Sequence, residues 1–82
     1  MKYYQYILEP LEYIPAHESF DAIRAVCKAA NKRLTDAGMG QYYEGDPCHY
    51  QSIAESDAYA VYRGLSGHYQ NLIRVTTKKG EL

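Results

Sequence analysis

The chain has little of what usually fills a protein core. It contains no tryptophan, one phenylalanine, six leucines, five isoleucines and three valines among 82 residues. A chain this short buries only a modest share of its surface, so its core must be small. Ten tyrosines supply the remaining aromatic volume. A tyrosine hydroxyl needs a partner when it is buried, so tyrosine favours half-buried positions and contact surfaces.

Long apolar runs are also missing. No stretch approaches the roughly 18 apolar residues of a transmembrane helix, and residues 1–6 lack the apolar segment of a signal peptide. Both absences favour the cytoplasm, where Cys27 and Cys48 are expected to be reduced thiols. The length fits one domain covering 1–82, and the formal net charge is −1.

No motif in the sequence names a reaction. A glycine-rich phosphate loop, a dinucleotide fingerprint and a nucleophile elbow are all absent, and no cysteine or histidine spacing suits zinc. We therefore expect no enzyme activity, no cofactor and no metal. The least implausible enzyme is a small metal-independent ribonuclease that uses His68 or Tyr69 as base and Arg63 or Arg74 on the phosphate. The net charge of −1 argues against a chain that must hold a polyanion.

Residues 20–37 show the clearest periodicity and predict a helix. Ser19 suits the N-cap and Gly38 suits a left-handed residue after the last turn. Apolar residues recur every three or four positions and should pack on a sheet: Phe20, Ile23, Cys27, Ala30, Leu34 and Ala37.

Residues 2–8 predict a strand with Tyr4, Tyr6 and Leu8 on one face, ended by Pro10. The connector that follows should tuck its apolar residues against the core: Leu11, Tyr13 and Ile14.

The second half of the chain is harder to interpret. Residues 38–48 predict a loop with a short extended piece at Tyr42 and Tyr43, and residues 49–56 fit either a strand or helical turns. Residues 58–63 and 69–78 predict two strands joined by a hairpin at 64–67, with Ile73 and Val75 inward and a frayed tail at 79–82. The fold class is α+β: one two-layer domain with a long helix on a small antiparallel sheet, in the order β-α-β-β, with room for one more short strand.

Charge is segregated along the chain. Between Leu34 and Tyr62 there is no lysine or arginine, but there are five carboxylates and several tyrosines. This segment is either a soluble connector whose tyrosines cover the sheet edge, or a docking surface in which carboxylates steer and tyrosines anchor. The docking alternative predicts these partner-binding residues: Tyr42, Tyr43, Glu44, Asp46 and Tyr50.

A basic row lies on the predicted helix at Arg24, Lys28 and Lys32, with Arg33 beside it. Helices normally expose charge opposite their apolar stripe, so the row is either a solvated face or a contact for phosphates or an acidic partner.

Two main hypotheses follow. The first is a non-enzymatic protein that binds a larger partner, a nucleic-acid-handling protein being one option, through its acidic tyrosine-rich segment. The second is a nucleic-acid-binding module that uses the basic helix face, although no strong direct binding to nucleic acid is expected at a net charge of −1. Homodimers are compatible with both. In general character the chain is similar to small inhibitors encoded by phages and mobile elements, which share its short single domain, segregated charge and exposed tyrosines. No stretch matches a known family residue by residue.

Overall fold

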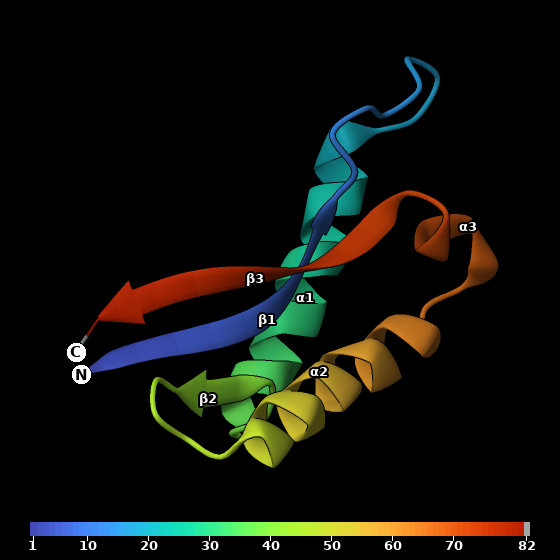
Figure 1. Ribbon diagram of the computed structural model, residues 1–82. Coiled ribbons are helices and arrows are strands. Elements are labelled where there is room, and N and C mark those ends of the chain that lie inside the picture. The colour runs from blue at the N-terminus through green and yellow to red at the C-terminus, as the bar shows by residue number, and fades with distance from the viewer. Residues whose placement is uncertain (82) are drawn as a thin grey trace.

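Three strands form one antiparallel sheet, and β1 lies in its centre (Figure 1). The computed structural model describes residues 1–81. Its elements in chain order are β1 (Lys2–Pro10), α1 (Phe20–Asp36), β2 (Gln41–Tyr43), α2 (Cys48–Arg63), α3 (Gly67–Gln70) and β3 (Ile73–Glu81). The sheet order is β2-β1-β3. The predicted α+β class, with a long helix on a small antiparallel sheet, is confirmed.

One face of the sheet carries the core. Leu8 of β1 and Ile73 of β3 are 1% and 2% exposed and pack with Ile23 and Leu34 of α1. Tyr6 lies on the same face of β1 as Leu8, since strand side chains alternate, and its hydroxyl accepts a hydrogen bond from Gln51 of α2 at 3.5 Å. Both long helices therefore cover the same face. The other face bears no helix in the part of the chain that the structure describes.

Helix α1 follows its sequence pattern closely. The Ser19 hydroxyl accepts from the amide of Ala22 at 3.3 Å, and Gly38 has a φ of +66°. The buried stripe consists of Ile23, Cys27, Ala30 and Leu34. Burial raises the pKa of the Cys27 thiol, and nearby Glu9 raises it further, so this cysteine is an inert core residue.

Three residues predicted to reach the core are exposed instead: Phe20, Tyr13 and Ala37, the C-cap of α1. Phe20 is the first residue of α1 and is 50% exposed, with the Arg24 guanidinium 5.8 Å from its ring centre. Tyr13 in the connector is 82% exposed, whereas Ile14 does pack on the core. Both misplaced rings lie at or beside the connector between β1 and α1, which holds no helix or strand.

Helix α2 is the main difference between the predicted and the observed secondary structure. Residues 58–63 form its last turns instead of a strand, and 64–67 leads into the single turn of α3 instead of a hairpin. Ala54 and Ala58 are its buried residues, four positions apart, and alanine is the strongest helix former. The tyrosines and Val61 within residues 59–62 favour a strand only when they are considered without that alanine pair.

The ends of β1 and β3 also differ from expectation. β1 continues to Pro10 instead of ending before it, and β3 begins at Ile73 because α3 occupies residues 67–70. Ile73 and Val75 do face the core. β3 continues through 79–81, where fraying was predicted, because these residues pair with residues 2–4 of β1. Position 82 lies outside the described residues.

Candidate functional site

The acidic corner is the junction between β2 and α2, and we define it by six residues: Tyr42, Tyr43, Glu44, Asp46, Tyr50 and Glu55. A tight turn forms its tip. The Asp46 amide donates to the Tyr43 carbonyl at 3.0 Å, and the Asp46 carboxylate accepts from the Tyr43 amide at 2.7 Å. Gly45 between them has a φ of +95°, which favours glycine. Asp46 therefore shapes this corner, as aspartate often does in turns.

Tyr42 packs on the protein's own sheet. Its ring stacks on Tyr4 at 5.2 Å and 18° and lies 5.9 Å from the ring of Tyr6. Burial raises the pKa of the Tyr42 hydroxyl, and Tyr6, Tyr4 and Glu55 raise it further. Tyr42 thus fits the alternative in which the tyrosines of this segment cover the sheet.

Tyr43 lies on the opposite, uncovered face of the sheet. Its ring meets the ring of Tyr3 edge-on at 6.4 Å and 64°, and its hydroxyl accepts from the Gln41 amide at 3.3 Å. Tyr3 in turn covers Gly80 on β3, where an added methyl group would overlap the tyrosine ring. The two rings therefore form an aromatic row on a face that no described helix shields.

Tyr50 and Glu44 are open to solvent. Tyr50, in the first turn of α2, is 49% exposed and lies 4.4 Å from the ring of His49. Glu44 and Glu55 are exposed, and neither makes an ion pair within residues 1–81. Their negative charge is not neutralised by a neighbouring side chain, so it extends into solvent.

The predicted basic face of α1 is less uniform in charge than the sequence suggests. Arg24, Lys28 and Lys32 share one side of α1, while Arg33 points about 100° away, as consecutive helix positions do. Lys32 is paired with Asp36 at 2.6 Å. Arg24 and Lys28 line a groove of about 540 Å³ between α1 and β1, but carboxylates line it too, so its charge is mixed.

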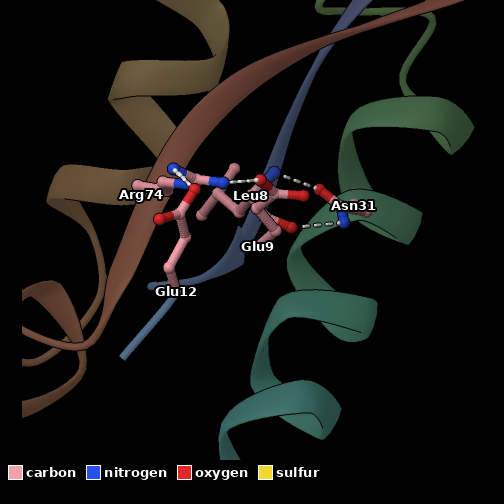
Figure 2. Close-up of polar contacts among 5 residues, drawn as sticks. All are labelled: Leu8, Glu9, Glu12, Asn31 and Arg74. Atoms are coloured by element: carbon pink, nitrogen blue, oxygen red, sulfur yellow. Dashed lines mark hydrogen bonds and ion pairs between the residues drawn. The ribbon is translucent and has the colours of Figure 1, made fainter. Parts of the chain in front are cut away.

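Arg74 and His68, two of the residues proposed for a ribonuclease, each pair with a carboxylate. Arg74 donates to Glu9 at 2.7 Å and lies 3.7 Å from a carboxylate oxygen of Glu12 (Figure 2). His68 instead lies 3.2 Å from the carboxylate of Glu18. Among the residues that the structure describes, no group of three or more histidine, cysteine or acidic side chains could hold a metal ion.

Three residues near these surfaces were missed in the sequence. Tyr3 belongs with the ring of Tyr43, and Glu55 belongs to the acidic corner. Both placements depend on residues distant in sequence, so the local pattern does not predict them. Asn31 of α1 is the third: its side chain accepts from the Leu8 amide at 2.7 Å and donates to the Leu8 carbonyl at 2.8 Å (Figure 2). The sequence carries one signal for the role of Asn31. Asparagine is a weak helix former, yet it stands in the middle of the predicted helix, next to the apolar stripe.

Comparison with known proteins finds no family model, no curated protein and no solved structure that matches the chain. None of the helices within residues 1–81 has the length and apolar character needed to span a membrane.

Proposed function

We propose that this chain is a non-enzymatic binding domain whose acidic corner docks on a basic surface of a larger, nucleic-acid-handling protein and blocks that surface as an inhibitor. The supporting observation is that Glu44 and Glu55, beside accessible tyrosine rings, make no ion pair with any residue of 1–81. Carboxylates attract a basic partner over distance, and tyrosines supply the anchoring contact area.

The residues of the corner have different roles in this proposal. Tyr43 and Tyr50 are the anchors, because their rings reach solvent. Glu44 steers association. Tyr42 and Asp46 hold the shape of the corner through the ring stack on β1 and the closed turn. Replacing Asp46 by asparagine keeps the side-chain acceptor, so Asp46→Asn tests its charge without opening the turn.

Affinity capture from native host extract, with and without nuclease, tests this function. The proposal expects the same protein to be recovered in both conditions, and its binding to weaken as salt rises. Recovery only in the untreated extract would contradict it, because nucleic acid would then bridge the two proteins. Glu12→Lys serves as a charge control, since its side chain is 86% exposed and lies in the connector rather than in the corner.

A nucleic-acid-binding module is the second candidate. Tyr3 and Tyr43 lie on the uncovered sheet face, and Lys78 lies on the same face beside Gln5. Rings on which bases stack, next to a cation for phosphate, are typical of single-strand binding surfaces. Arg24, Lys28, Lys32 and Arg33 would add phosphate contacts. Submicromolar binding to an arbitrary oligonucleotide at physiological salt would support this candidate over the first.

A further inference from the structure

The β2 side of β1 is closed to further pairing. The Tyr6 amide donates to the Gly40 carbonyl at 2.8 Å, and both backbone groups of Leu8 bond the side chain of Asn31. Pro10 comes next on the same side, since even-numbered residues of β1 point their backbone groups that way. Proline has no amide to donate. No additional strand can use this edge.

The outer edge of β3 is open from Val75 to Lys79 within the residues that the structure describes. β1 and β3 pair Tyr3 with Gly80 and Gln5 with Lys78, so even-numbered residues of β3 face β1. The odd-numbered residues Val75, Thr77 and Lys79 therefore point their backbone groups away from the sheet. Within residues 1–81 these outward groups make no hydrogen bond. Figure 1 shows β3 as the outermost strand, with no element beyond it along the left half of the ribbon.

The charge on this edge selects what can pair there. Lys78 and Lys79 are exposed, lie on opposite faces of β3 and make no ion pair within the described residues. The Lys79 ammonium lies 5.9 Å from the ring centre of Tyr4. Lys79 lines a hollow of about 390 Å³ at the end of the ribbon, together with Lys2 and Glu81. If two copies of the chain paired through β3, their lysines would come close together. Lysines on an edge strand therefore oppose pairing of identical strands.

We propose that an extended, acidic segment of a partner protein adds to β3 as an additional antiparallel strand. Backbone hydrogen bonds to Val75, Thr77 and Lys79 supply part of the affinity, as in other complexes formed by strand addition. The ammonium groups of Lys78 and Lys79 supply the selectivity, because adjacent acidic residues of the added strand fall on opposite faces, one toward each lysine. This surface is separate from the acidic corner, so the inference does not rest on the proposed function.

The pairing scheme defines the sequence of the added strand. Two consecutive glutamates should lie opposite Lys78 and Lys79, an apolar residue opposite Val75, and a neutral residue opposite Glu81, which would repel a carboxylate. A synthetic peptide with these features, Thr-Thr-Glu-Glu-Thr-Val-Val with blocked ends, is the probe. Its matched control replaces both glutamates by lysine.

Titration of the full chain with each peptide, followed by amide NMR, tests the proposal. We expect the glutamate peptide to shift the amide signals of Val75, Thr77 and Lys79 and to slow their hydrogen exchange, with at least a tenfold weaker effect from the lysine peptide. Lys78→Glu with Lys79→Glu should reverse this preference. Lys28→Glu on α1 is the matched control and should leave it unchanged.

Two proline variants separate the outer edge from the fold. Thr77→Pro removes an outward amide that makes no hydrogen bond to any described residue, so the protein should stay folded and lose peptide binding. Thr76→Pro removes an amide that faces β1, so it should destabilise the sheet. Peptide binding that survives in a folded Thr77→Pro variant would overturn the proposal.

Two further outcomes would also overturn it. One is equal binding of the glutamate and lysine peptides, or no binding of either at millimolar concentration. The other is slow exchange of the three outward amides in the chain alone together with a dimeric mass in solution, which would make a second copy the occupant. The charge-reversed variant and its Lys28 control must keep the same melting temperature for any comparison to count.

Discussion

The two ends of the sheet carry different kinds of side chain. At one end, which we call the aliphatic end, Leu8 and Ile73 pack with Ile23 and Leu34, and none of the four is more than 2% exposed. At the other, the tyrosine end, the sheet carries Tyr3, Tyr4, Tyr42 and Tyr43, all only partly buried. One end is sealed and the other remains in contact with water.

This difference separates stability from recognition. Full burial of aliphatic side chains gives most of the free energy of folding. Tyrosines that stack on one another while keeping a polar edge in solvent contribute less to folding, but they are well suited to contacts with a partner. A side chain removed from the aliphatic end should therefore mainly change the free energy of unfolding, whereas one removed from the tyrosine end should mainly change binding.

The largest effect is expected at the aliphatic end, from Leu34→Ala. Leu34 is 1% exposed and touches both the sheet and the glycine turn that follows α1. Its truncation should lower the free energy of unfolding by about 2–4 kcal/mol, as for other buried leucines. Chemical denaturation measures this value. A loss below about 1 kcal/mol would mean that this end is not the sealed core described here.

A smaller loss is expected from Asn31→Ala, which removes the side chain that closes the β1 edge. Both backbone groups of Leu8 would lose their partners, and the cost of leaving such groups unpaired is about 1–3 kcal/mol. Thr35→Ala, one turn further along α1, removes only an exposed bond to Gln5 and should cost less than about 0.5 kcal/mol. Equal losses in the two variants, measured by denaturation, would remove this role for Asn31.

The smallest change is expected at the tyrosine end, from Gly80→Ala. The new methyl group would displace the ring of Tyr3, which can swing into solvent, so the cost should be near 1 kcal/mol. In a Tyr3→Ala background the same substitution should cost nothing, because the ring is gone. A double-mutant cycle on the free energy of unfolding measures the coupling. A coupling near zero would show that Tyr3 does not cover Gly80.

The sequence predicts the first half of the molecule better than the second. The helix at 20–36 carries a regular apolar stripe, a serine cap and a terminal glycine, and these local signals agree with its packing. The sequence predicts a strand at residues 58–63 because tyrosine and valine favour strands, and only the spacing of Ala54 and Ala58 indicates the helix. Packing of α2 on α1 and on the sheet decides between helix and strand, and this packing cannot be inferred from residues 58–63 alone.

The candidate site, too, is predicted from the sequence only in part. The negative charge and the tyrosines of 34–62 are visible in the sequence, and so is a short extended piece at Tyr42 and Tyr43. Their placement on opposite faces follows from the strand, with Tyr42 on the helix-covered side. The approach of Glu55 to Tyr42 depends on α2, whose full extent the sequence pattern does not predict. The open edge of β3 depends on strand order, which single-sequence patterns do not determine.

The most direct test of the separation between the two ends combines Tyr43→Ala with Glu44→Lys and measures both binding and stability. Affinity for the captured partner should fall by about 2 kcal/mol or more, roughly 30-fold, with slower association from the reversed charge. The free energy of unfolding should fall by only about 1 kcal/mol, the value of one aromatic contact. Unchanged affinity in this folded variant would contradict the account and exclude the acidic corner as the recognition surface.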